Sequence, residues 1–223
     1  VYENAGKTSG AYSWGVYGVH PYVLLNYQQN LDNLLTVAHE LGHAWHSRQM
    51  AGLPLMMTRE PMPLAETASI FNETLLSHLV LAQAEDQERF ALLESSLMEA
   101  TQTVVDIYSR FLFESEVVDT RADHSMSVDE LKDAMLRAQD ASYGDGLDRN
   151  FRHPYMWACK SHYYSSGLNF YNFPYAFGLL FGKGVFAQYL EKGDAFVPAY
   201  NRLLRLCGSD TVANVAASVG IDV

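Results

Sequence analysis

The chain has 223 residues, of which 48% are hydrophobic, so it has enough apolar material for a core and is not a disordered segment. Its 26 acidic residues outnumber its 15 basic residues, which gives a formal net charge of −11. That balance argues against a protein that binds nucleic acid or an anionic membrane, because such proteins need a basic face. No apolar run approaches the roughly 18 residues of a membrane span.

Cysteine content and the first residues bear on the protein's surroundings. Only two cysteines occur, Cys159 and Cys207, so we expect no disulfide framework and favour a reducing compartment, the cytoplasm. The chain opens with the sequence Val-Tyr-Glu-Asn, without a methionine or an apolar signal stretch. We therefore interpret it as a fragment of a longer protein.

The first patterned stretch covers residues 8–28 and is rich in glycine, tyrosine and valine. Alternating aromatic and small residues, with Pro21 at a strand start, predict a short β-hairpin or two edge strands. Glycine in such a strand lets a second backbone approach closely. A β-rich segment is thus expected within residues 1–29.

A helical period begins after Asn30. It predicts a helix over residues 31–50, capped by Asn30 or Asp32 and ended by Gly52 and Pro54. Each residue turns the helix by about 100°. One apolar stripe therefore forms along the helix, made by Leu34, Ala38, Leu41 and Trp45.

The rest of the chain is also patterned as helices. A capping box at Ser127–Glu130 starts one helix, which ends before Gly144. Other helices are predicted over residues 64–83, 86–118, 156–165, 174–191, 194–206 and 210–219. The sequence therefore predicts a single, mainly α domain over residues 1–223 with a small antiparallel β element near its start.

The segment His39-Glu40-Leu41-Gly42-His43 is an H-E-x-x-H motif. Two histidines four residues apart lie on one helix face, here away from the apolar stripe, and can bind one metal ion. The Glu between them, Glu40, can act as general base on a metal-bound water. The competing interpretation is two polar histidines on the surface of an amphipathic helix.

A catalytic zinc ion needs a third protein ligand and an open position. The motif's extended form with a third histidine fails, because that position is Gln49, so a carboxylate is expected from Glu60, Glu66 or Glu73. Of the last two, one can ligate while the other supports a ligand histidine. His46 shares the histidine face, but three ligands from one rigid helix fit a tetrahedral ion badly. A pocket wall or a buried histidine is its favoured interpretation.

Aromatic residues are concentrated between Phe151 and Phe181, where 11 of the chain's 28 occur. Core packing explains most of them. Tyrosine is unusually common, however, and a buried tyrosine hydroxyl needs a hydrogen-bond partner. A developing oxyanion in a cleft above a metal would be such a partner. The spacing does not choose between the tyrosines.

Four blocks together resemble the oligoendopeptidase F branch of the thimet-oligopeptidase family of zinc metallopeptidases. They are the metal helix from His39 to Ser47, the segment Leu64–Ser69, the aromatic stretch from Trp157 to Gly178, and the glycine- and tyrosine-rich segments before the helix. The resemblance covers nearly the whole chain. It implies a zincin-like helical catalytic domain that hydrolyses internal bonds of short peptides with one zinc ion.

The resemblance also implies residue roles. The metal ligands would be His39, His43 and Glu66, and the general base would be Glu40. With Glu66 as ligand, Glu73 is left as the acid that supports a ligand histidine. The transition state would be assisted by His162, Tyr171 and Tyr175; Tyr164 is a weaker candidate for that role, and we expect it to bind substrate. The family's small sheet pairs with extended peptide, which points to Gly10, Ala11 and Tyr12 as substrate-binding residues. The resemblance implies short peptides as substrates. Because family members are considerably longer, we also expect the missing N-terminal part of the same chain as a partner.

Two other functions stay open at this stage. One is a non-catalytic helical fragment that holds a metal for structure or binds peptides without cutting them. A structural zinc site is usually closed and often uses cysteine. Both cysteines lie far from the motif in sequence. The other is a zinc exopeptidase, although no dedicated site for a peptide terminus is recognisable.

Overall fold

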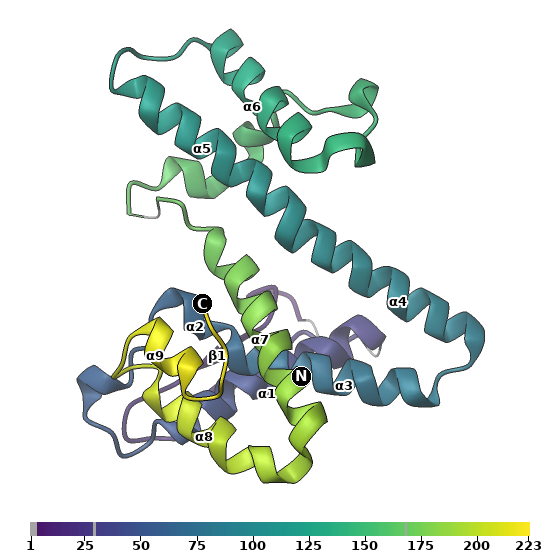
Figure 1. Ribbon diagram of the computed structural model, residues 1–223, viewed down its shortest axis with the longest axis vertical. Coiled ribbons are helices and arrows are strands. Elements are labelled where there is room, and N and C mark those ends of the chain that lie inside the picture. The colour runs from purple at the N-terminus through teal and green to yellow at the C-terminus, as the bar shows by residue number, and fades with distance from the viewer. Residues whose placement is uncertain (1–3, 29, 168) are drawn as a thin grey trace. The chain divides into compact units, whose positions relative to one another are not determined.

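The computed structural model describes residues 4–28, 30–167 and 169–223 (Figure 1). Residues 1–3 and 29 of the predicted β-rich segment therefore lie outside the described residues. The chain divides into two compact units: unit 1 contains residues 1–92 and 177–223, and unit 2 contains residues 93–176. The single domain predicted over residues 1–223 stays a prediction.

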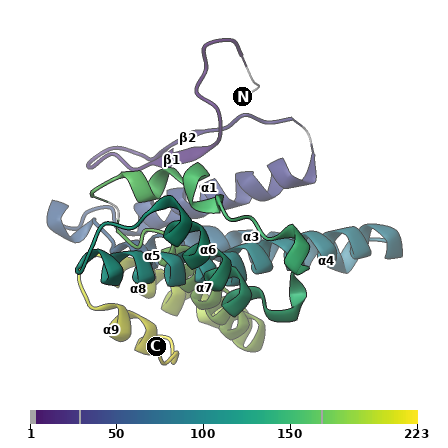
Figure 2. The same cartoon turned by 90° about the horizontal axis from the view of Figure 1, so that it is seen from above.

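Unit 1 begins with the predicted hairpin. Strands β1 (Tyr12–Trp14) and β2 (Tyr22–Leu24) pair antiparallel, with Ser13 opposite Val23. The hairpin lies along helix α1 (Figure 2). A side chain at Gly15 would approach the Ser47 hydroxyl to 2.8 Å, so glycine permits this close approach of the hairpin to the helix.

Helix α1 (Leu31–Gln49) follows the predicted bounds closely. The side chain of Asn30 caps it by accepting a hydrogen bond from the Asn33 backbone N–H at 2.8 Å. Its apolar stripe is not a buried face, because Leu41 is 53% exposed and Trp45 is 39% exposed. The buried residues of α1 are Glu40, Gly42 and His46 instead. Gly42 and His46 are four residues apart and share the side of the helix that meets α3 and α8, so hydrophobicity alone misidentified the side of the helix that meets the core.

The single helix predicted over residues 64–83 is wrong in one respect. Two helices, α2 (Met62–Ala65) and α3 (Thr67–Gln83), are separated at Glu66. Glu66 has φ −89° and ψ 2°, outside the usual helical values. The chain therefore changes direction at Glu66, the residue expected to ligate the metal.

The core of unit 1 is built from α3 and the C-terminal helices, which are α7 (Phe173–Lys192), α8 (Val197–Leu206) and α9 (Val212–Ala217). Part of α7 belongs to this unit, from Phe177 onward. Buried side chains from all four helices form one cluster, which includes Phe71, Val185, Leu203 and Val215. The cluster holds α3 in place, and α3 in turn packs against α1, the helix that carries the histidine motif.

Unit 2 contains the end of α4 (Asp86–Thr101), a π-helical turn (Gln102–Asp106), α5 (Ile107–Arg121) and α6 (Val128–Tyr143). Both halves of the predicted capping box are present at the start of α6. A small core around Phe113 and Met135 joins α5 to α6. Residues 156–165, expected to be helical, form two short 3₁₀ turns, Met156–Cys159 and Ser161–Tyr164.

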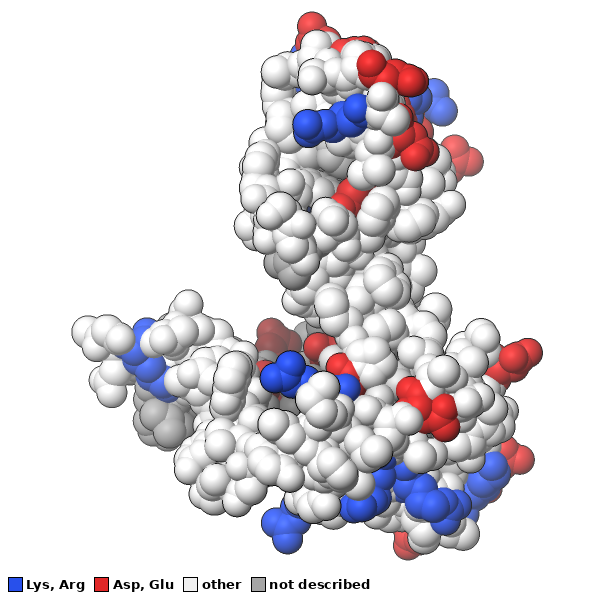
Figure 3. Space-filling model, turned by 90° about the vertical axis from the view of Figure 1, so that its left-hand side faces the viewer, with Lys and Arg blue, Asp and Glu red and all other residues white. Residues whose placement is uncertain are grey.

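The observed architecture confirms the mainly α fold with a small antiparallel β element. Among the described helices, none combines the length and the apolar character that crossing a bilayer demands. Most of the face seen in Figure 3 carries neither acidic nor basic side chains. This agrees with the 18% of residues in the chain that are charged.

Candidate metal centre

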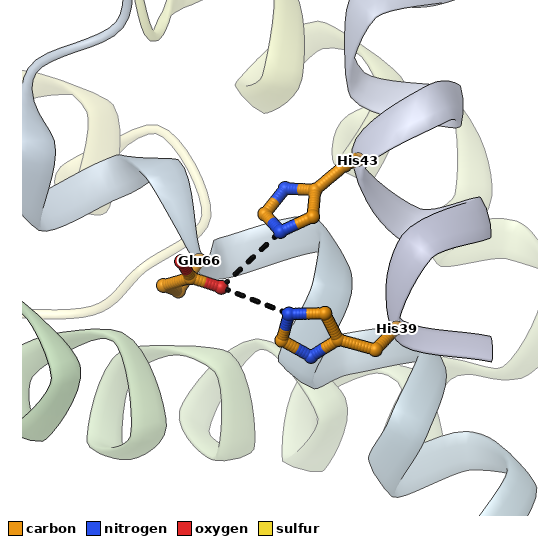
Figure 4. Close-up of side chains that lie close together, drawn as sticks. All are labelled: His39, His43 and Glu66. Atoms are coloured by element: carbon orange, nitrogen blue, oxygen red, sulfur yellow. Dashed lines mark ion pairs between the residues drawn. The ribbon is translucent and has the colours of Figure 1, made fainter. Parts of the chain in front are cut away.

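The two motif histidines and Glu66 converge in unit 1 (Figure 4). Glu66 Oε2 lies 3.3 Å from His39 Nε2 and 3.4 Å from His43 Nε2. The histidines come from consecutive turns of α1, and the carboxylate comes from the break between α2 and α3. Within the described ranges this is the one group of three metal-ligating side chains found close together. Glu60 is not part of it.

Two glycines allow the elements to meet at this point. A Cβ at Gly42 would lie 2.4 Å from the Ala68 carbonyl oxygen, far inside contact distance. A Cβ at Gly178 would lie 2.8 Å from the Cβ of Glu66. Absence of a side chain at both positions lets α1 and α7 pack directly against the segment that carries Glu66.

Further polar side chains hold the three residues in place. Glu73 Oε2 lies 3.2 Å from His39 Nδ1, so that ring's other nitrogen is directed towards Glu66. The Ser69 hydroxyl donates to Glu66 Oε2 at 2.8 Å. Ser69 was not singled out from the sequence. Its position three residues after Glu66, one helical turn away, is the signal that could have identified it.

The acids strongly perturb the protonation of the histidine. Burial lowers the pKa of His39, but hydrogen bonds and charge interactions with Glu66 and Glu73 outweigh it and raise the pKa to about 10. Burial raises the pKa of Glu66, yet hydrogen bonds from His39 and His43 hold it well below its usual range. The metal-free site is therefore charged at neutral pH, and a metal ion has to displace a proton from His39.

The donor set fits a zinc ion. Ligand atoms about 2.0–2.1 Å from a tetrahedral zinc ion lie about 3.3–3.4 Å from one another. The two distances from Glu66 Oε2, 3.3 and 3.4 Å, agree with that spacing. Two imidazole nitrogens and one carboxylate oxygen are also a ligand set used by catalytic zinc sites, which leave a fourth position open.

Glu40 lies beside the three candidate ligands but is not one of them. Its side chain is buried, and its Oε2 has no hydrogen-bond partner. Burial raises the pKa of Glu40, while the neighbouring histidines and a hydrogen bond from the Ser13 backbone oppose the rise. A buried carboxylate with a raised pKa and an unused oxygen is suited to accept and return a proton.

The predicted substrate-binding residues of the hairpin lie on or next to β1. Gly10 has φ +81°, a left-handed conformation that favours glycine. Tyr12 is 45% exposed. Because the Ser13 backbone bonds to Glu40, β1 runs past the general-base candidate. Across the described residues β1 pairs only with β2, so its other edge is unpaired.

His162, Tyr171 and Tyr175 lie together in unit 2. The ring of His162 stacks on that of Tyr171, with centroids 4.6 Å apart and an interplanar angle of 27°. The hydroxyls of Tyr171 and Tyr175 are 3.1 Å apart. Tyr164 is 64% exposed and belongs to the preceding 3₁₀ turn. His162, Tyr171 and Tyr175 thus form one cluster, and Tyr164 does not take part in these ring and hydroxyl contacts.

His46 points elsewhere, as the favoured interpretation from the sequence anticipated. It is 2% exposed, and its Nε2–H donates to the backbone carbonyl of Leu204 at 3.2 Å. Burial lowers the pKa of His46 despite the nearby charge of Glu60. The residue joins α1 to α8 and is not placed among the candidate metal ligands.

Comparison with known proteins identifies the family to which the chain is similar. A model of peptidase family M3 matches residues 1–223. Oligopeptidase PepF of Bacillus subtilis (strain 168) is 29% identical over 233 residues, covering 100% of this chain and 33% of the relative. The oligoendopeptidase F homolog of Lactococcus lactis subsp. lactis (strain IL1403) is 32% identical over 225 residues, covering 100% and 37%. The chain thus spans about a third of the length of the curated relatives it matches.

Solved structures share the fold. A structure from Chlamydophila abortus has a TM-score of 0.84 at 30% identity, covering 99% of this chain and 37% of that chain. Oligoendopeptidase-F from Enterococcus faecium has a TM-score of 0.70 at 24% identity, covering 86% and 34%. The similarity extends through both units, so the arrangement of helices within each is a shared one.

Proposed function

The chain belongs to peptidase family M3, and from that premise we propose that it is the catalytic part of a zinc-dependent oligoendopeptidase that hydrolyses internal bonds of short peptides. The observation that carries the proposal is the convergence of His39, His43 and Glu66 beside the buried Glu40. Relatives named oligopeptidase or oligoendopeptidase F support the substrate class. Because those relatives are about three times as long, the remainder of a longer chain is proposed as a partner.

The proposed metal ligands are the Nε2 atoms of His39 and His43 and a carboxylate oxygen of Glu66. A bound zinc ion supplies Lewis acidity, which polarises a peptide carbonyl and lowers the pKa of water. Glu73 keeps the His39 ring oriented through Nδ1, and Ser69 keeps Glu66 oriented. These contacts support a site that is preformed before the metal arrives.

Glu40 is the proposed general base. Its carboxylate takes a proton from the attacking water and passes it to the leaving amine nitrogen, so one group serves both proton transfers. Its raised pKa brings it closer to the working pH than an ordinary glutamate. The Ser13 backbone N–H holds one end of this side chain.

The remaining roles concern the substrate. His162, Tyr171 and Tyr175 are proposed to donate hydrogen bonds to the oxygen that becomes negative as the carbonyl is attacked. The unpaired edge of β1, with Gly10, Ala11 and Tyr12, is proposed to bind the extended peptide backbone. Tyr164, well exposed, is a proposed contact for substrate side chains.

The test is Glu40→Gln in the full-length protein, with metal content and peptide cleavage measured together. The amide has the same shape but cannot take up a proton at neutral pH, so we expect kcat to fall by about 10²–10⁴-fold with zinc still bound. Glu191→Gln, an exposed change on α7, is the matched control and should leave both quantities unchanged. Near-normal cleavage by zinc-loaded Glu40→Gln would refute the mechanism.

A further inference from the structure

Helix α5 in unit 2 holds the segment that carries Tyr171 at three points. The Glu114 carboxylate accepts a hydrogen bond from the Phe170 backbone N–H at 2.7 Å. Arg110 Nη1 donates to the Asn172 side-chain oxygen at 3.1 Å. The Tyr163 hydroxyl donates to the Arg110 backbone carbonyl at 3.4 Å. Arg110 and Glu114 are four residues apart and so lie on one face of the helix.

The backbone at Phe170 is strained. Its φ of +52° is left-handed, and it is the one non-glycine residue with positive φ in the described part of the chain. A bulky residue keeps this conformation only where its surroundings enforce it. The hydrogen bond to Glu114 and the contact of the Phe170 ring with Phe111, centroids 5.6 Å apart, supply that enforcement from α5.

Arg110 is itself fixed in a buried network. It is 8% exposed and pairs with Asp106, which is 4% exposed. Asp106 also accepts hydrogen bonds from Tyr143 at 3.1 Å and from Gln102 at 2.6 Å. Asp106 ends the π-helical turn, a feature found disproportionately at functional sites. Arg110, the anchor of Asn172, is thus held in place by a buried ion pair with Asp106.

We propose that Glu114 and Arg110 are positioning residues that clamp the residues on either side of Tyr171 and so hold its ring against His162 and its hydroxyl beside Tyr175. The clamp acts on the residue before Tyr171 through its backbone and on the residue after it through its side chain. Neither clamping residue touches the reacting atoms. This inference rests on the proposed function, in which Tyr171 assists the transition state.

The clamp is tested first without catalysis. In the metal-free full-length protein, Glu114→Ala should accelerate hydrogen exchange of the Phe170 amide by about tenfold or more, because its acceptor is removed. Glu114→Gln keeps an acceptor oxygen and should restore protection. Glu116→Ala, which removes another acid of α5 that pairs with Arg137, is the matched control. Unchanged α6 amides would show that unit 2 is still folded, and unchanged exchange at Phe170 in Glu114→Ala would overturn the clamp.

Kinetics then test positioning. Glu114→Ala should lower kcat by about ten- to a hundredfold with little change in KM, because small misplacements of catalytic groups are costly. In a Tyr171→Phe background the same change should have almost no further effect, because the clamp acts through that hydroxyl. Additive losses in the double variant, or normal kcat in Glu114→Ala, would overturn the positioning role. Failure of the proposed function would appear separately, as full activity of zinc-loaded Glu40→Gln.

Discussion

Oε2 of Glu66 is the atom on which the candidate site is centred. It lies within 3.4 Å of both imidazole rings and accepts a hydrogen bond from Ser69. Glu73 contacts the other ring nitrogen of His39, Nδ1, at 3.2 Å. Because Glu66 and Glu73 both contact His39, the pKa of this histidine is raised to about 10, and the hydrogen bonds from the two histidines hold the pKa of Glu66 well below its usual range. The contacts therefore hold the ligands close together before any metal binds.

His46 gives a prediction about pH. Its pKa is lowered by burial in the folded protein, whereas the unfolded value is about 6.5. Below pH 6.5 the unfolded chain therefore binds more protons at this residue, and stability falls by up to about 1.4 kcal/mol per pH unit. His46→Gln keeps a donor for Leu204 but cannot titrate.

The measurement is the free energy of unfolding of both metal-free proteins between pH 7.5 and about 5. As pH falls through this window, we expect the free energy of unfolding to decrease more for the unchanged protein than for His46→Gln. Other histidines contribute equally to both proteins and cancel in the comparison. Parallel pH profiles would contradict the assignment of His46 as a neutral buried group.

At the scale of elements, close contact between α1 and α3 determines whether the site can exist. The two helices approach so closely at Gly42 that its missing side chain would overlap the Ala68 backbone. The contact lies between the two motif histidines, so any widening moves both away from Glu66. At Gly178 on α7 a Cβ would lie 2.8 Å from the Cβ of Glu66, so the close packing of α7 also limits the movement of Glu66.

Gly42→Ala should therefore damage both fold and site. Alanine favours a helix over glycine by about 1 kcal/mol, but overpacking against a backbone costs about 1–3 kcal/mol or more. We expect a net loss of stability and markedly weaker zinc binding, measured by denaturant unfolding and by metal content after dialysis. Gly146→Ala is the matched control, because a Cβ there meets no atom within 4 Å. Equal behaviour of the two variants would show that the helices can separate without consequence.

At the scale of the whole molecule, the candidate metal ligands and the tyrosine cluster belong to different units. His39, His43 and Glu66 all lie in unit 1, whereas Tyr171 lies in unit 2. A metal ion held by these three side chains would link α1 to the break between α2 and α3, and both of these elements belong to unit 1. Stabilisation by metal should accordingly be local.

Removing zinc with a chelator tests this division. A ligand at 1,000 times its Kd stabilises the folded state by about 4.1 kcal/mol. After chelation we expect faster hydrogen exchange in α1 and α3 and unchanged exchange in α6. The exchange is measured by mass spectrometry of peptic peptides. Readdition of zinc should restore protection. Equal acceleration in both units, or none in α1, would contradict a metal site confined to unit 1.

Local spacing explains what could be predicted. Residues four apart share a face of any helix, so the pairing of His39 with His43 needed only their separation and a helical period. The Asn30 cap and the capping box at Ser127 depend on neighbours within one turn, and both are present. The mainly helical fold followed from periodicities of the same short range.

The choice among Glu60, Glu66 and Glu73 could not be made in this way, because it depends on how α1 meets α3 and on the break at Glu66. Contact between residues far apart in the sequence also reversed the expected burial of α1, where Glu40 is buried and Leu41 is exposed. The left-handed Phe170 and its bond to Glu114, 56 residues earlier, left no signal in the pattern. Chain neighbours set which atoms can share a helix turn, whereas packing between distant segments sets which of those atoms come within bonding distance.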